Sequence, residues 1–205
     1  MLFYVSNHNA MIPDTIIESY PVKIKNYKKN DIVFIEGEMA HFYYQIKEGE
    51  VKMFNITEDG KEFVQSFFSG KTSFGEPPLF SNTTYPASAQ CLTDCSLYIL
   101  PKEPFFQLLK EHPEIHLKFT KLICVRMIFK SKMAKELSIH PPEHRILTLL
   151  NHLKETAKVT TPYEVNLTRQ QISELTGLRV ETVIRSIKKL EKLKKLSIKQ
   201  RKVYL

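Results

Sequence analysis

Two short helices are encoded by residues 167–193, LTRQQISELTGLRVETVIRSIKKLEKL. Thr168, followed three residues later by Gln171, is the pattern of a capping box and predicts the start of a helix. Gly177 interrupts the helical pattern, as expected of a residue with a positive φ in a tight turn. A second amphipathic helix is predicted from Val180. Two short helices joined by a glycine turn are typical of a helix-turn-helix.

The second helix has an apolar face and a polar face. Val183, Ile187 and Leu190 recur at the i, i+4, i+7 spacing of a buried stripe. On the opposite face, Arg185 can donate two hydrogen bonds to guanine, and Glu181 can accept one from cytosine. In the alternative interpretation, these two side chains form an i, i+4 surface pair without a function.

The residues around this helix are suited to contact DNA. Hydroxyl, amide and cationic side chains near the helix starts can bind phosphate oxygens. Residues 196–205, LSIKQRKVYL, predict two short strands around a basic turn, a wing whose Lys199 joins the backbone contacts. The candidate DNA-binding residues are Thr168, Arg169, Gln170, Arg179, Val180, Glu181, Thr182, Ile184, Arg185, Lys188, Arg201 and Lys202.

The distribution of charge supports this interpretation. The 205-residue chain has a formal net charge of +8. Residues 1–140 carry 16 basic and 16 acidic side chains, whereas residues 141–205 carry 14 basic and 6 acidic ones. The whole excess of positive charge therefore lies in the last 65 residues, which is typical of a nucleic-acid-binding domain.

The first 100 residues predict a different architecture. Five of the six glycines lie between residues 37 and 75, and they separate short runs rich in β-branched and aromatic residues, such as DIVFIEG and KEFVQSFFSG. Short strands separated by turn residues at this spacing predict an antiparallel barrel or sandwich. A strand pair at Ala87–Leu92 and Ser96–Leu100 would close it.

A long helix is predicted between these two parts. It begins at Pro113 and is ended by Pro141 and Pro142, which mark a domain boundary. An apolar seam recurs along it at alternating spacings of four and three, so the helix packs on its own barrel, on a twin helix in a dimer, or on both. The seam comprises Ile115, Phe119, Leu122, Arg126, Phe129 and Met133. A short amphipathic helix at 143–155 follows.

Composition excludes several classes of protein. Hydrophobic residues make up 42% of the chain, which excludes a disordered polypeptide. No apolar run reaches the length of a membrane span, and the first residues lack the pattern of a signal peptide, so no membrane partner is expected. Three cysteines favour a reducing, cytoplasmic environment over a disulfide framework.

Taken together, the motifs resemble those of the CRP/FNR-type transcription regulators. The resemblance is carried by FGE at 74–76, ASAQCLTDC at 87–95, a long helix after Leu100 and Pro101, and TGLRVETVIR at 176–185. It implies an α+β fold with three parts. They are an N-terminal antiparallel, jelly-roll-like β-roll for sensing at 1–112, a long dimerisation helix at 113–140 and a C-terminal winged helix-turn-helix at 141–205.

The resemblance also implies a function. We expect a homodimeric regulator, not an enzyme, that binds double-stranded DNA at a pseudo-palindromic site, with RNA polymerase as a partner if it activates transcription. The family's base-contacting Glu and Arg correspond to Glu181 and Arg185, and Val180 favours the FNR-like branch over the cAMP-sensing one. The expected dimer interface consists of Phe119, Leu122, Arg126, Phe129 and Met133.

Two departures from the family pattern bear on the effector. Tyr85 and Pro86 stand where the cyclic-nucleotide branch has an Arg-Ser pair, so a nucleotide phosphate would be buried without a cation. Glu76 stands at the family's ribose-binding acid, although a turn-stabilising carboxylate is the alternative. Residues 1–90 contain no cysteine, which excludes an N-terminal iron–sulfur cluster. A regulator that does not respond to cAMP is therefore expected; one gated by a cyclic nucleotide or another small molecule is the alternative.

No cofactor or metal is expected. The pairs His112/His116 and His140/His144 have i, i+4 spacing, but prolines interrupt both and no carboxylate or cysteine completes a set. Cys91 and Cys95 are expected to be core thiols rather than a redox pair. A cupin-like metalloenzyme is a remote alternative, because an H-x-H ligand pair is missing at His41.

Overall fold

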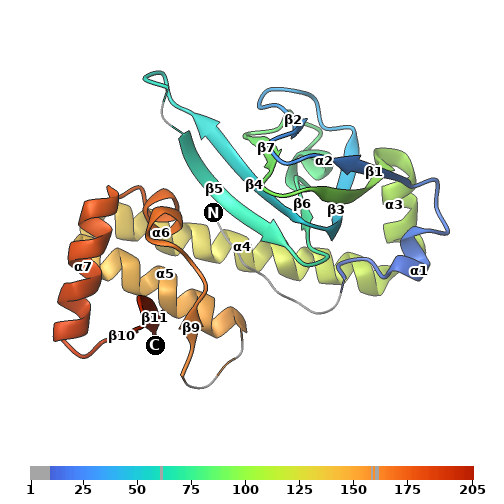
Figure 1. The fold of residues 1–205 in the computed structure, drawn as a ribbon. Helices are drawn as coiled ribbons and strands as arrows, with labels where there is room; N and C mark the ends of the chain where they lie inside the picture. The colour runs from blue at the N-terminus through green and yellow to red at the C-terminus, as the bar shows by residue number, and fades with distance from the viewer. Residues whose placement is uncertain (1–9, 61, 158, 160–161) are drawn as a thin grey trace. The chain divides into compact units, whose positions relative to one another are not determined.

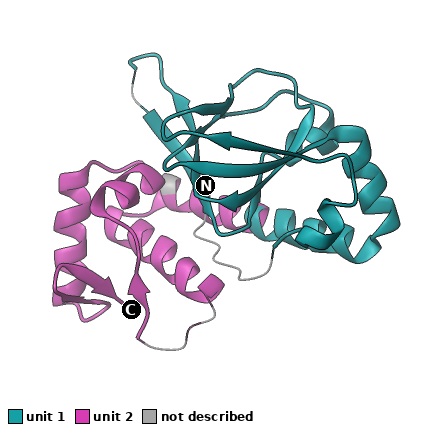
Figure 2. Ribbon diagram, turned by 45° about the vertical axis from the view of Figure 1, so that its right-hand side comes forward, with its two compact units in different colours: residues 1–126 teal, residues 127–205 magenta. Residues whose placement is uncertain are grey.

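The computed structural model describes residues 10–60, 62–157, 159 and 162–205. The chain divides into two compact units, residues 1–126 and 127–205 (Figure 2). Most of the strands lie in the first unit, and helices make up most of the second (Figure 1). The predicted α+β class is confirmed. Within the described ranges, no helix has the length and apolar character needed to span a membrane.

The first unit contains two four-stranded antiparallel sheets, ordered β1-β8-β3-β6 and β2-β7-β4-β5. Its elements are α1 (Asp14–Ile17), β1 (Lys23–Tyr27), β2 (Ile32–Phe34), β3 (Phe42–Glu48), β4 (Glu50–Ile56), β5 (Glu62–Ser69), β6 (Ser73–Phe74), α2 (Pro77–Ser81), β7 (Ser88–Cys91), β8 (Cys95–Pro101) and α3 (Lys102–Glu111). Both strands expected near residues 87–100 are present, as β7 and β8, but they lie in different sheets and do not pair with each other.

Aromatic side chains join the two sheets. The ring of Phe74 on β6 lies 5.6 Å from the rings of Tyr44 on β3 and Phe68 on β5. Phe34 on β2 stacks on Tyr85, with their ring centroids 3.8 Å apart. Because these strands belong to different sheets, the inner faces of the sheets share one core, as in a β-sandwich or roll.

The tight turn between β3 and β4 requires a glycine. Gly49 has φ +96°, and a Cβ atom added there would lie 2.6 Å from the carbonyl oxygen of Asp94. Glycine alone combines this backbone conformation with so close an approach.

The long helix, α4 (Pro113–Ile139), contributes to the core of both units. In its first half, the ring of Phe119 lies 5.5 Å from that of Phe105 and 5.6 Å from that of Tyr43. In its second half, the ring of Phe129 lies 3.9 Å from that of His152. The predicted helix is confirmed, but the compact units differ from the expected division at 1–112, 113–140 and 141–205, because each half of α4 packs within its own unit.

The seam that defined the expected dimer interface packs largely inside the chain. Phe119, Phe129 and Met133 are 0%, 1% and 2% exposed, so they have no surface left to cover with a second copy. Arg126 binds a buried carboxylate of its own unit, and Leu122 is half-buried. The sequence spacing identifies an apolar seam, but it does not reveal which residues pack against that seam.

The opposite face of α4 is exposed. At about 100° per residue, the residues of this face lie roughly 160° around the helix from those of the seam. Leu117 is 55% and Ile128 is 56% exposed, which is unusual for large apolar side chains on one helix. The exposed stripe consists of Leu117, Lys121, Cys124, Ile128, Ser131, Lys135 and Ile139.

The second unit completes the chain with a helical core and a small sheet ordered β10-β11-β9. Besides the end of α4, its elements are α5 (Pro142–Ala157), β9 (Glu164–Val165), α6 (Arg169–Thr176), α7 (Val180–Lys192), β10 (Ser197–Lys199) and β11 (Lys202–Tyr204). Ile146, Leu149, Leu150 and Leu153 are buried on α5, as the predicted helix at 143–155 requires.

The junction of α4 and α5 overturns one expectation about metal ligands. A carboxylate does complete the set near His140 and His144, because Glu136 lies on the last turns of α4 beside them. The two prolines end one helix and start the next without separating the three side chains.

Candidate nucleic-acid interface

The first helix of the motif, α6, is built as the sequence predicts. The Oγ1 of Thr168 accepts a hydrogen bond from the backbone N–H of Gln171 at 3.1 Å. The side-chain oxygen of Gln171 accepts one from the backbone N–H of Thr168 at 2.8 Å. Gly177 ends the helix with φ +65°. The predicted capping box and glycine turn are thus confirmed, and they fix where α7 begins.

The second helix, α7, is fixed by its apolar stripe. Val183, Ile187 and Leu190 are buried, and α7 packs against α5 and α6. An ion pair of 3.2 Å between Lys189 and Glu143 also ties α7 to α5. The face with Ile184 and the polar candidates is left exposed.

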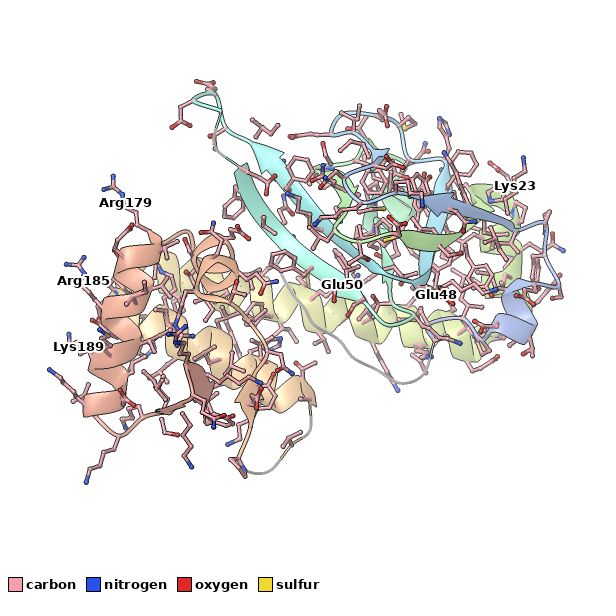
Figure 3. All side chains as sticks on the ribbon, in the orientation of Figure 1. Lys23, Glu48, Glu50, Arg179, Arg185 and Lys189 are labelled. Atoms are coloured by element: carbon pink, nitrogen blue, oxygen red, sulfur yellow. The ribbon has the colours of Figure 1, made fainter. Side chains whose placement is uncertain are left out.

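The outward side chains of α7 extend toward solvent. Figure 3 shows Arg179 and Arg185 projecting from the outer side of the helix. Glu181, Arg185 and Lys188 are exposed, whereas Val180 and Thr182 are half-buried. Among the residues that the structure describes, no ion pair joins Arg185 to Glu181, so the proposed i, i+4 surface pair is not formed. The guanidinium of Arg185 is therefore available to a partner.

A groove of about 540 Å³ lies between α7, the start of α6 and the wing. Six of the candidate residues line it, namely Thr168, Arg169, Ile184, Lys188, Arg201 and Lys202. The others lie outside its lining, on the first turn of α6, at the N-cap of α7 and on the first two turns of α7. The structure thus gathers residues from three separate segments of the second unit on one concave surface with a basic rim.

The wing is confirmed and has an additional strand. β10 and β11 pair with Lys199 opposite Lys202, and β11 also pairs with β9, which sequence analysis did not predict. On β9, Glu164 forms an ion pair with Lys202, and this raises the pKa of that ammonium. Glu164 also accepts a hydrogen bond of 2.8 Å from the hydroxyl of Tyr204. Two residues are too few to show an alternating pattern, so β9 and the role of Glu164 had no sequence signal.

Arg169 is half-buried at the edge of the groove. Burial lowers the pKa of its guanidinium, and its Nη2 donates to the backbone carbonyl of Arg201 at 3.4 Å. Gln170 donates to the carboxylate of Glu174 at 2.8 Å. These two side chains therefore join local hydrogen bonds at the edge of the groove.

In the β-roll, Glu76 is satisfied by groups of its own unit. The fully buried carboxylate forms an ion pair of 3.0 Å with the Nη1 of Arg126 and accepts a hydrogen bond from the hydroxyl of Ser73. The Nη2 of Arg126 donates to the backbone carbonyl of Ser73 at 3.1 Å. Burial, followed by the charge of Glu76, raises the pKa of Tyr43. The spacing of the seam predicted Arg126 at an interface, and no sequence signal indicated its pairing with Glu76.

Tyr85 and Pro86 are held by the surrounding strands. Tyr85 is 3% exposed, its hydroxyl donates to the carbonyl of Phe42 at 3.3 Å, and burial raises its pKa to about 12. The carbonyl of Pro86 accepts a hydrogen bond of 2.8 Å from Asn55. A cavity of about 350 Å³ beside Tyr85 is lined by Val33, Phe34, Glu38, Met39, His41, Phe42, Tyr44 and Tyr85. No lysine or arginine is among these lining residues.

Cys91 ends β7 and Cys95 begins β8, in different sheets, and both thiols are buried. Burial, and then a hydrogen bond with Cys95, raises the pKa of Cys91 to about 12. A protonated, enclosed thiol is a poor nucleophile, which agrees with the expected core role.

Comparison with known families places both units. Residues 24–112 match the model of the cyclic nucleotide-binding domain, and residues 144–205 match that of the Crp-like helix-turn-helix domain. The cAMP-activated global transcriptional regulator CRP of Salmonella typhimurium is 29% identical over 172 residues, covering 82% of each chain. The transcriptional activator protein anr of Pseudomonas aeruginosa is 25% identical over 182 residues, covering 87% of this chain and 74% of its own.

The fold agrees with these matches. The structure of the c-di-GMP responsive global regulator CLP of Xanthomonas campestris superposes with a TM-score of 0.71 at 22% identity, covering 93% of this chain and 96% of the other. The matching models and relatives describe transcription regulators rather than enzymes. With a cyclic nucleotide-binding domain followed by a Crp-like helix-turn-helix, this chain belongs to the CRP/FNR family of transcription regulators.

Proposed function

We propose that the chain acts in the bacterial cytoplasm as a homodimeric, sequence-specific DNA-binding regulator of a pseudo-palindromic site. The observation that carries the proposal is the outer face of α7. There, Arg185 and Glu181 are exposed and form no ion pair with each other, beside a groove whose rim includes Lys188 and Arg201. An exposed helix face of this kind fits the major groove of DNA.

The roles of the candidate residues follow from their positions. Arg185 forks onto the O6 and N7 of guanine, and Glu181 accepts from the amino group of cytosine. Val180 and Ile184 offer apolar contact to a thymine methyl group. The remaining candidates position the protein on phosphate oxygens; they are Thr168, Arg169, Gln170, Arg179, Thr182, Lys188, Arg201 and Lys202.

The dimer forms through the exposed stripe of α4. Leu117 and Ile128 are more than half exposed, and Cys124 lies between them on the same face. A second copy of the chain packing its own α4 on this stripe would cover these side chains with a matching apolar surface. Two copies then present two α7 helices to half-sites about one helical turn of DNA apart.

The β-roll does not bind cAMP. Glu76 is already neutralised by Arg126, so a ribose hydroxyl would have to displace an internal ion pair. At the position of the phosphate, Tyr85 and Pro86 supply no cation. Titration calorimetry is expected to show no binding at micromolar cAMP. A micromolar dissociation constant would mean that the assignment of this site is wrong.

A different effector is the second candidate for the β-roll. The cavity beside Tyr85 is mostly aromatic and aliphatic and has no lysine or arginine in its lining. Such a cavity favours an uncharged, apolar small molecule over a nucleotide.

Selection of bound fragments from random duplex DNA tests the main proposal. We expect an enriched sequence with two inverted half-sites, and binding that weakens steeply with salt, by about −0.9 in the log–log slope for each phosphate neutralised. When Lys188→Ala is compared with the unmodified chain, Lys192→Ala at the far end of α7 is the control for the loss of one positive charge. No enriched sequence, or a flat salt dependence, would contradict the proposal.

A further inference from the structure

Three side chains that the DNA interface does not use converge where α4 meets α5. Glu136 lies on the last turns of α4, His140 just after its end, and His144 on the first turn of α5. One ligand atom from each residue lies within 4.8 Å of the other two. All three belong to the second unit, so their arrangement does not depend on the β-roll.

The geometry of the cluster is that of an enclosed carboxylate with two imidazoles. Glu136 is 7% exposed, and its Oε2 lies 2.5 Å from the Nδ1 of His144. The rings of His140 and His144 are stacked, with their centroids 4.2 Å apart and their planes at 24°. A buried carboxylate requires a cationic or hydrogen-bonding partner. Here the partners are side chains that also ligate metals.

We propose that Glu136, His140 and His144 bind a divalent transition-metal ion of the Zn²⁺, Co²⁺ and Ni²⁺ class. Imidazole nitrogen and carboxylate oxygen are ligands that this class prefers, whereas Mg²⁺ and Ca²⁺ prefer oxygen alone. Two histidines and one carboxylate leave a fourth position for water or another group.

The cluster can reach metal geometry with small side-chain movements. Ligand bonds of about 2.0–2.2 Å in a tetrahedral site place neighbouring ligand atoms roughly 3.3 Å apart. The Nδ1 of His144 must therefore move slightly away from Glu136, and the ring of His140 must turn toward it. The side chain of His144 is 52% exposed and has room for this movement. The metal takes the place of the proton that links His144 to Glu136 in the metal-free protein.

A metal at this place would join the end of one helix to the start of the next. α4 ends at Ile139 and α5 begins at Pro142, so the ion would bridge the turn formed by Pro141. With three protein ligands, of which His140 is half-buried and His144 is exposed, the site suits an exchangeable ion. The proposal concerns metal binding alone and is independent of DNA recognition.

The test uses the full chain after treatment with a chelator and dialysis. Co²⁺ is titrated and followed by its visible absorption spectrum, and Zn²⁺ is then titrated by calorimetry. We expect one ion per chain, displacement of Co²⁺ by Zn²⁺, and a higher melting temperature with metal. His140→Gln and Glu136→Gln should each weaken binding by at least about 10-fold.

Two control variants separate this site from other ligands on the surface. His116→Gln removes an exposed imidazole in the first unit, and Cys124→Ser removes the exposed thiol of α4. Both should leave the affinity unchanged. An unchanged affinity in His140→Gln, an equal loss of affinity in either control, or a cobalt–thiolate charge-transfer band would overturn the proposal, as would an absence of saturable binding.

Folding of the variants is checked by circular dichroism. If Glu136→Gln unfolds the protein, His140→Gln decides the outcome, because His140 is partly exposed and its ring contact is with His144. At one metal concentration, the melting temperature of the unmodified chain should rise more than that of His140→Gln.

Discussion

Each unit contains an arginine, and the two arginines serve opposite purposes. In the first unit, Arg126 is enclosed and bound to the buried carboxylate of Glu76. In the helical unit, Arg185 is exposed and forms no ion pair with Glu181. The enclosed guanidinium is committed to holding its own fold together, whereas the exposed one remains available to a partner. Whether a cation is already paired, more than whether it is present, separates a structural residue from a binding residue.

The largest expected effect comes from breaking the enclosed pair. Arg126→Met leaves Glu76 buried without its cation, and removal of one partner of a buried ion pair costs about 3–5 kcal/mol. Urea denaturation should show this loss. Arg126→Met combined with Glu76→Gln should recover much of it, while Arg185→Ala should change stability by less than about 0.5 kcal/mol. Equal effects of Arg126→Met and Arg185→Ala would erase the distinction.

Two neighbouring residues of α4 give the next effect. Ile128→Glu places a charge on the exposed stripe and should weaken the dimer by roughly 100-fold or more, about 3 kcal/mol, while each protomer stays folded. Phe129→Glu buries its charge beside His152 and should instead unfold the second unit. Sedimentation velocity measures the first result and circular dichroism the second. An unchanged dimer in Ile128→Glu would show that the exposed stripe is not the interface.

A smaller effect separates base reading from phosphate binding on α7. Arg185→Ala should lose about 1–3 kcal/mol of discrimination at one G·C pair in each half-site. Lys188→Ala should keep that preference and lower the salt slope by about one. Binding assays with a panel of single-base variants measure both. If Arg185→Ala weakens every variant equally, its assigned role is wrong.

The smallest effect concerns a cation that is paired yet exposed. Lys202 on the wing is held by Glu164, and both lie at the surface. Glu164→Gln frees the ammonium and removes one negative charge from the groove, so DNA should bind a few-fold more tightly at low salt. Fluorescence anisotropy measures the affinity, and Glu155→Gln on α5, outside the lining of the groove, controls for net charge. Equal gains in both variants would show that pairing at Lys202 has no effect.

The helix-turn-helix could be predicted closely because its signals are local. The capping box at Thr168, the turn at Gly177 and the stripe on α7 each depend on residues within about two turns of one another. Local chemistry of this kind largely determines where a short helix begins and ends. The outward face of α7 then follows from the helical period.

Contacts between distant residues could not be predicted in the same way. The seam of α4 was recognised, but its partners on α3, β3 and α5 come from other parts of the chain. The pairing of Arg126 with Glu76 spans fifty residues, and no spacing rule reaches so far. The cluster of Glu136, His140 and His144 was missed for a different reason, because prolines were expected to separate side chains that the turn keeps together.

The strand order of the β-roll also bears on how the chain folds. β1 pairs with β8, and this pairing brings Lys23 opposite Ile99, which is far away in the sequence. In the helical unit, α6 and α7 are joined by one short turn, and the widest strand pairing links Glu164 to Tyr204. Since pairings of greater sequence separation form more slowly, the helical unit is expected to collapse first during refolding. During synthesis, by contrast, β1 leaves the ribosome early. It stays without its partner strand, β8, until about seventy more residues have been synthesised.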